Sequence, residues 1–395
     1  MPPEQVDNIE DHWPTDCAHC RARLPSGARR RDAADPVRHQ VTDIPPVKPS
    51  TTEHRQHSQT CPCCGEVTLA SLPSDVPRSA FGPRLMAFVA VLSGCYRLSK
   101  RAVVEAVQDL FSVDMSLGSV PTCERSVSNN VAPAVAEAHE FIQTQAVVHA
   151  DETGWVEGRK RAWMWVAATT LVTVFRVCRE RSKAAAKALL GSFAGILVTD
   201  RWDSYDWYKG VRQVCWAHLK RDFQAMSERG GAAGRTGRQL LACARQVFHL
   251  WHRVRDGTLT RAQFRWRMRP LRREVERLLK LGAIGRTSIA GSCLEMLRLL
   301  HAFFTFVDVE GVDPTNNHGE RQIRAAVLWR KTSFGTHSEA GSRFVERIMT
   351  VRSTLRQQGR DVVEYLVHAQ EAALRGEPVE SLLPGTVQVV QLAAA

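Results

Sequence analysis

The order of extended and helical segments between residues 146 and 216 is the feature that most constrains the fold. Three segments there are rich in β-branched and aromatic residues and are joined by connections too short to hold a helix. These segments cover residues 146–156, 161–169 and 171–177. They predict three consecutive antiparallel strands. An alanine-rich helix is expected next, at residues 182–190, followed by a buried-type strand at 195–200 and a last strand at 212–216.

This order of elements predicts an α/β fold with a ribonuclease-H-like core, in which helices pack on a mixed sheet. Two acids stand at unusual places in it. Asp151 lies in the middle of an otherwise apolar first strand, and Asp200 closes a strand of Ile, Leu and Val. Burying an acid there is costly unless something binds it. Because the first and fourth strands lie side by side in such a sheet, we expect both carboxylates to converge at one end of it.

A third acid, Glu320, lies on a predicted helix at residues 315–331. Five side chains of this helix fall within an arc of about 100°. They are Asn316, Asn317, Glu320, Arg324 and Lys331. Hard divalent cations prefer carboxylate oxygens, and phosphodiester cleavage with two metal ions needs about three acids. The sequence therefore predicts a site for Mg²⁺ or Mn²⁺ at Asp151, Asp200 and Glu320, beside amides and cations that suit a phosphate.

Several of these residues have a plainer alternative. Asp151 can be a buried acid without a function. Asp200 is equally well explained as the cap of a turn at the strand end, and Glu152 as a solvent-facing neighbour of Asp151. Arg321 and Arg324 can be simple surface charges.

Residues 1–79 are poor in apolar periodicity and are expected to form a zinc-binding segment and a proline-rich linker. The segment holds two cysteine pairs, each with two residues between its thiols. The pairs are Cys17 with Cys20 and Cys61 with Cys64. This spacing lets both thiolates of a pair reach one tetrahedral zinc, so the four cysteines predict a Zn²⁺ site. Cys63 is an alternative ligand, and the plainer explanation is a set of unrelated free cysteines in a tail without a core.

The positive charge of the chain is concentrated in one region. The formal net charge is +12, and residues 212–286 alone hold 18 Lys and Arg against 5 Asp and Glu. Long helical patterns at 240–253 and 261–281 indicate a basic helical insertion at residues 223–312, and its charge favours nucleic acid as the partner. The arginines predicted to share one DNA-facing side are Arg261, Arg265, Arg269 and Arg272. The alternative is a solvated helix pair that only keeps the protein soluble.

The remaining segments complete the expected organisation. Residues 80–145 are helical and form a small domain with a turn at 117–122 that suits either a helix-turn-helix or plain packing. The catalytic core is assigned to residues 146–222 and 313–375, and residues 376–395 to a loose C-terminal tail.

Targeting signals are not expected. The longest apolar run has 8 residues, against about 20 for a membrane span, and the first residues are acidic and polar. An odd number of cysteines, 11, fits a reducing cytosol. We therefore expect a cytoplasmic protein that does not cross a membrane.

Four ordered motifs resemble those of the IS66-family transposases of bacterial insertion sequences. They are His149-Ala-Asp-Glu-Thr-Gly-Trp155, Val198-Thr-Asp-Arg-Trp-Asp-Ser-Tyr205, Cys215-Trp-Ala-His-Leu-Lys-Arg-Asp-Phe223 and Thr315-Asn-Asn-His-Gly-Glu-Arg-Gln-Ile-Arg324. The resemblance also covers the cysteine pairs and spans nearly the whole chain. It implies a DDE catalytic domain with Asp151, Asp200 and Glu320 as the triad. It further implies that Cys215 and His218 match the family's Cys-x-x-His element.

The resemblance implies a DNA transposase that cuts the ends of its element and joins them to a target by metal-dependent phosphoryl transfer. Phosphates would be held by Arg321, Arg324, Arg330 and Lys331. The partners expected are double-stranded DNA, further copies of the chain assembled on that DNA, and accessory proteins of the same element. Two alternatives remain: a ribonuclease-H-like nuclease that does not transfer strands, and a DNA-binding relic without catalysis.

Overall fold

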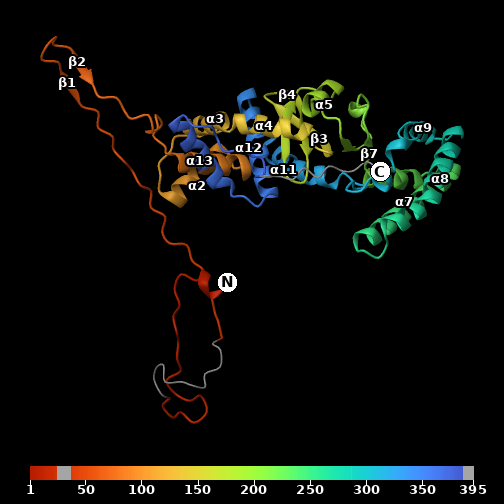
Figure 1. Cartoon of the computed structure of the whole chain (residues 1–395), viewed down its shortest axis with the longest axis horizontal. Coiled ribbons are helices and arrows are strands. Elements are labelled where there is room, and N and C mark those ends of the chain that lie inside the picture. The colour runs from red at the N-terminus through yellow and green to blue at the C-terminus, as the bar shows by residue number, and fades with distance from the viewer. Residues whose placement is uncertain (25–36, 286, 386–395) are drawn as a thin grey trace. The chain divides into compact units, whose positions relative to one another are not determined.

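The structure, a computed structural model, describes residues 1–24, 37–285 and 287–385 (Figure 1). Its contacts divide the chain into two units, Met1–Ser50 and Thr51–Ala395. In the first unit, a 3-10 helix, η1 (Pro3–Gln5), comes first, and a bridge between Asp16 and Arg23 closes a turn around Cys17. Residues 25–36 of the predicted zinc-binding segment and residues 386–395 of the expected tail lie outside the described residues.

A mixed five-stranded sheet is the centre of the second unit. Its strands are β3 (Val147–Glu157), β4 (Lys160–Ala168), β5 (Thr173–Cys178), β6 (Ile196–Thr199) and β7 (Arg212–Val214). The order across the sheet is β5-β4-β3-β6-β7. β3 pairs antiparallel with β4 and β4 with β5, while β3–β6 and β6–β7 are parallel. The three predicted antiparallel strands and the two later strands are therefore confirmed, within two residues at each end. A separate hairpin of β1 (Ser58–Thr60) and β2 (Val67–Leu69) frames the second cysteine pair.

Helices precede, interrupt and follow this sheet along the chain. Before it lie α1 (Pro83–Ala90), a π-helical turn η2 (Val91–Cys95), α2 (Lys100–Phe111), α3 (Ser119–Asn130) and α4 (Ala132–Gln143). Between the strands lie α5 (Lys183–Leu190) and the 3-10 helix η3 (Asp203–Tyr205). After it come α11 (Asn317–Ser333), α12 (Glu339–Gln357) and α13 (Val362–Arg375). One apolar core joins the sheet to the early helices and to α11, α12 and α13.

A second apolar core lies in the segment between β7 and α11. This segment contains α6 (Trp216–Ser227), α7 (Gly231–Arg255), α8 (Arg261–Ile284), α9 (Ala290–Arg298), η4 (Leu300–Ala302) and α10 (Thr305–Asp308). Trp216, Phe264 and Phe306 are fully buried in it. α7 begins nine residues earlier than its clearest helical pattern, because Gly237 lies close against Met226 at the end of α6 and Ala233 is buried in the same core.

The edge strand β5 is covered by side chains of α12. The backbone N–H groups of Thr173, Phe175 and Val177 donate to side-chain oxygens of Thr354, Thr350 and Glu346, respectively. The acceptors are spaced by four residues on the helix and the donors by two on the strand, so one helical turn matches two strand residues. These contacts satisfy backbone N–H donors that the edge strand β5 would otherwise leave unpaired.

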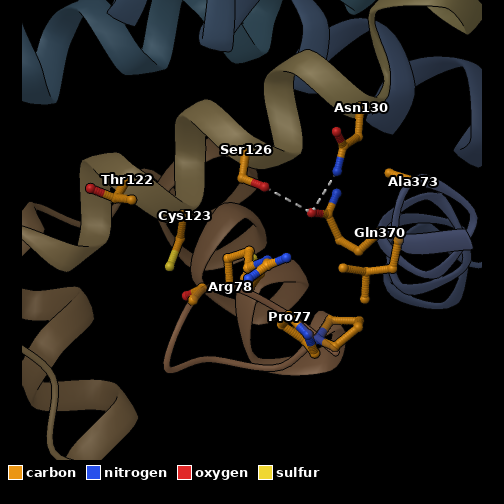
Figure 2. Close-up of a pocket in the computed structure, with 12 residues that line it drawn as sticks. Pro77, Arg78, Thr122, Cys123, Ser126, Asn130, Gln370 and Ala373 are labelled. Atoms are coloured by element: carbon orange, nitrogen blue, oxygen red, sulfur yellow. Dashed lines mark hydrogen bonds between the residues drawn. The ribbon is translucent and has the colours of Figure 1, made fainter. Parts of the chain in front are cut away.

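A pocket of about 380 Å³ lies where α3 and α13 meet the segment before α1 (Figure 2). The side-chain oxygen of the buried Gln370 on α13 accepts hydrogen bonds from Ser126 and Asn130 on α3. Pro77 and Arg78 line the same pocket from the preceding segment. Because Ser119 already begins α3, most of the turn expected at 117–122 is helical.

The segment after α13 differs from the expected loose tail. Leu382 is fully buried, and the hydroxyl of Tyr365 donates to the carbonyl oxygen of Glu380 at 2.7 Å. Ser381 donates to Glu137 on α4. Buried Leu382 and the partly buried Val379 and Leu383 therefore anchor residues 379–383 on the core.

Candidate active site

Two acids meet at the ends of neighbouring parallel strands. The register pairs His149 of β3 with Val198 of β6, so two residues further on Asp151 lies beside Asp200. The pKa of Asp151 is raised to about 8, mainly by burial and in addition by the negative charges of Glu152, Asp200 and Glu320. The backbone N–H of Glu152 donates to the Asp151 carboxylate at 2.9 Å and only partly opposes this shift. The predicted acids thus lie close enough to act on one another.

A single buried amide places Glu320 next to these acids. Asn316, fully buried at the start of α11, donates through Nδ2 to the carbonyl oxygen of Ala150 at 2.8 Å. Its Oδ1 lies 3.0 Å from Nδ1 of His149, whose pKa burial lowers to about 4, so the ring is neutral and Nδ1 donates. One turn along the helix, the backbone N–H of Glu320 donates to the Asn316 carbonyl. Asn316 was predicted to face a phosphate, but its side chain joins α11 to β3 instead.

An open groove of about 710 Å³ lies along α11. Asp151, His218 and Glu320 line it together with cations and a few apolar side chains. The cations are Arg221, Arg321, Arg324 and Lys331. The predicted face of Asn317, Glu320, Arg324 and Lys331 therefore lines one groove. Arg330 is not among the residues that line it, because Nη1 of Arg330 donates to the carbonyl oxygen of Gly154 on β3 at 3.4 Å.

The Cys-x-x-His residues lie at the same groove. Cys215 is the fully buried N-cap residue of α6, and His218 lies in the first turn of that helix. Nδ1 of His218 is 3.5 Å from Oε1 of Glu320, and Sγ of Cys215 is 4.0 Å from the same oxygen. One potential ligand atom from each of the three side chains lies within 4.8 Å of the others.

Glu152 does not face solvent, so that alternative was wrong. Its side chain is 1 % exposed and accepts hydrogen bonds from Arg181, at 2.6 and 2.8 Å, and from the hydroxyl of Tyr205 at 2.6 Å. The guanidinium of Arg181 also stacks on Trp202, 3.7 Å from the ring centre. This network ties β3 to the loop that follows Asp200. The pattern of residues along β3 could not predict this network, because Arg181, Trp202 and Tyr205 come from later segments.

Asp200 caps the turn at the end of its strand, as the alternative explanation of this residue predicts. Its Oδ1 accepts a hydrogen bond from the backbone N–H of Trp202 at 2.9 Å. The contact orients the carboxylate at the strand end and leaves its charge close to Asp151 and His218, whose pKa values it affects.

The four arginines expected on one side of α8 fall into two groups. Nη2 of Arg261 donates to the carbonyl oxygens of Phe306, Val307 and Val309, at 2.9 to 3.3 Å. Arg272 forms an ion pair with Asp308 at 2.7 Å. These two arginines therefore bind the chain's own segment at 304–309, whereas Arg265 and Arg269 are exposed.

Both cysteine pairs adopt the same local turn, each within its own unit. The backbone N–H of Arg21 donates to the carbonyl oxygen of Cys17, and that of Gly65 to the carbonyl oxygen of Cys61. Hydrogen bonds from the backbone two and three residues ahead lower the pKa of the Cys17 and Cys61 thiols. These turns favour thiolates, as metal-binding cysteine turns do.

Comparison with known proteins decides the family. The sequence model of the family described as "Transposase IS66 family" matches residues 78–343. This stretch holds Asp151, Asp200 and Glu320, as well as Cys215 and His218. The chain belongs to the IS66 transposase family. The family is one of DDE-type transposases. In the described part of this IS66 protein, no helix is long and apolar enough to span a membrane.

This IS66 protein is also similar to one curated relative. The uncharacterized protein y4qI of Sinorhizobium fredii is 23% identical over 259 residues, which cover 57% of this chain and 46% of that protein. The chain thus matches less than half of that relative's length.

Proposed function

We propose that this IS66 protein is the DNA transposase of a bacterial insertion sequence, with a ribonuclease-H-like DDE core. Asp151, Asp200 and Glu320 would hold Mg²⁺ or Mn²⁺, and the enzyme would cleave the element's ends and join them to target DNA. The observation that supports this proposal is the position of the three acids, at two adjacent strand ends and in the first turn of α11, where the charges of Asp200 and Glu320 help to raise the pKa of Asp151.

The donor set fits a hard divalent cation. All three side chains offer carboxylate oxygens, burial already disfavours charge on Asp151, and a bound cation would offset both the desolvation and the mutual repulsion. When bound, the metal would supply electrostatic stabilisation of the transferring phosphoryl group and activation of the attacking oxygen.

The chain's own cations would position the DNA. Arg221, Arg321, Arg324 and Lys331 line the groove next to the acids, so they can hold phosphates on either side of the bond to be broken. Arg330 was expected to bind a phosphate. In this proposal it instead holds α11 on β3, through its hydrogen bond to Gly154.

The two cysteine turns support a separate zinc site in the N-terminal part of the chain. Each pair presents two thiols in a turn that lowers the pKa of its first cysteine, as a zinc knuckle requires. We therefore propose that Cys17, Cys20, Cys61 and Cys64 bind Zn²⁺ and help to recognise the element's ends.

The test is cleavage and joining of a duplex that carries the inverted repeats flanking the coding sequence, in Mg²⁺. Asp151→Asn, Asp200→Asn and Glu320→Gln should each abolish both steps and leave DNA binding intact, because an amide keeps the shape but loses the charge. Glu105→Gln, at an exposed position on α2, is the control. Hydrolysis without joining would favour the nuclease, and binding without either step would favour the relic.

A further inference from the structure

Two helices begin at one point beside the groove. The backbone N–H of Asn316, the N-cap of α11, donates to Sγ of Cys215, the N-cap of α6, at 3.1 Å. The backbone N–H of Trp216 donates to the carbonyl oxygen of Pro314 at 2.8 Å. The positive ends of two helix dipoles therefore meet where Cys215 and Glu320 lie, and both favour an anionic side chain.

His218 adds an observation that helix capping does not explain. In the described structure its Nδ1 is shielded from solvent and has no hydrogen-bond partner, although Oε1 of Glu320 is 3.5 Å away. A ring nitrogen that is shielded from solvent and has no hydrogen-bond partner destabilises the folded state. A capping role explains the thiol of Cys215 alone, but leaves this nitrogen unsatisfied between a thiol and a carboxylate.

We propose that Cys215, His218 and Glu320 form a binding site for a transition-metal ion of the Zn²⁺ class. Thiolate, imidazole and carboxylate are the three side-chain ligands of zinc, whereas Mg²⁺ takes oxygen ligands. Three ligand atoms within 4.8 Å of one another need only small movements to converge on one ion, and a fourth position stays open toward the groove.

The site has a consequence for catalysis that rests on the proposed function. Glu320 belongs to both ligand sets, so an ion held by Cys215 and His218 would fix or withdraw the third acid of the proposed triad. Binding of the transition metal is nevertheless measured without DNA, so its failure is distinguishable from failure of the transposase proposal.

Cobalt(II) is the probe, because thiolate ligation to it produces a charge-transfer absorption band. The parent for this experiment is the full-length chain with Cys17→Ser, Cys20→Ser, Cys61→Ser, Cys63→Ser and Cys64→Ser, so that the N-terminal cysteines contribute no thiolate. Titration should give one Co²⁺ per chain with a thiolate band, and Zn²⁺ should displace it. Circular dichroism before metal addition checks that each variant is folded.

Cys215→Ser should remove the band, since serine can still cap the helix but supplies no thiolate. His218→Gln, at a partly exposed position, and Glu320→Gln should keep the fold and weaken Co²⁺ binding about tenfold or more. Cys243→Ser, at a buried cysteine of α7, is the matched control and should leave the band unchanged. A parent without the band, or a band that survives Cys215→Ser, would overturn the proposal.

Discussion

The side-chain amide of Asn316 donates to the carbonyl oxygen of Ala150, the residue directly before Asp151, across 166 positions of sequence. The same side chain accepts a hydrogen bond from His149, and its backbone contacts Cys215. Because Glu320 lies one helical turn beyond Asn316, this junction sets the distance between the first and third acids of the site. Asn316 therefore positions the acids without lining the groove.

Replacing Asn316 by alanine should reduce DNA cleavage strongly while DNA binding persists. The change leaves the buried Ala150 carbonyl and the His149 ring without partners, so we also expect a loss of about 2–4 kcal/mol in the free energy of unfolding. Denaturant unfolding and the cleavage assay measure the two effects. Asn317→Ala, at the exposed neighbouring amide, is the control and should leave stability almost unchanged. Full cleavage activity in the Asn316 variant would show that α11 is held by other contacts.

The pKa of Asp151 predicts a stability that depends on pH. The folded protein holds a proton on Asp151 up to about pH 8, whereas the unfolded chain loses it near the ordinary value. The folded state thus binds more protons between these two values, so the free energy of unfolding attributable to Asp151 falls as the pH rises through that window and stays low above it.

Asp151→Asn removes this penalty. In metal-free buffer the variant should be more stable than the parent by roughly 2 kcal/mol or more at pH 8.5, because one pKa unit corresponds to about 1.4 kcal/mol, and the difference should vanish near pH 4. Thermal unfolding at several pH values measures it, with Glu105→Gln as the reference substitution. Added Mg²⁺ should stabilise the parent and not the variant. An equal stability difference at pH 4 and 8.5 would contradict the raised pKa.

The spacing of the cysteines in the sequence predicts one Zn²⁺ per chain at Cys17, Cys20, Cys61 and Cys64, in addition to any ion at Cys215. Metal analysis of the purified protein should find it, and Cys61→Ala or Cys64→Ala should release it and expose residues 15–66 to protease, since ligand loss removes the folding energy of the metal. Cys63→Ala is the matched control and should retain the ion. If the protein is active and free of zinc, the cysteines have another role.

The sequence predicted those features that depend on local pattern. β3, expected at 146–156, is found at Val147–Glu157, because a long run of β-branched and aromatic residues has few other structures available. The helical period likewise placed Glu320, Arg324 and Lys331 on one face. Local pattern does not say which face a distant segment covers. That is why the burial of Glu152 by Arg181 and Tyr205 was missed.

The arginines of α8 also show that local pattern does not reveal which side chains contact distant segments. They provide a test of DNA binding by this helix. Arg265 and Arg269 are exposed, whereas Arg261 holds three carbonyl oxygens around the end of α10. Each phosphate that a cation neutralises contributes about −0.9 to the slope of log K against log salt. The double substitution Arg265→Glu and Arg269→Glu should therefore flatten the slope for DNA binding by about 2 and leave thermal stability almost unchanged.

Arg261→Gln should show the opposite behaviour. It leaves carbonyl oxygens at the end of α10 without their donor, so we expect a loss of about 1–3 kcal/mol in the free energy of unfolding and little change in the salt slope. Binding isotherms at several salt concentrations, together with denaturant unfolding, separate the two effects. If reversing Arg265 and Arg269 leaves the slope unchanged, this face of α8 is only solvated. The phosphates would then be held by the cations of the groove along α11.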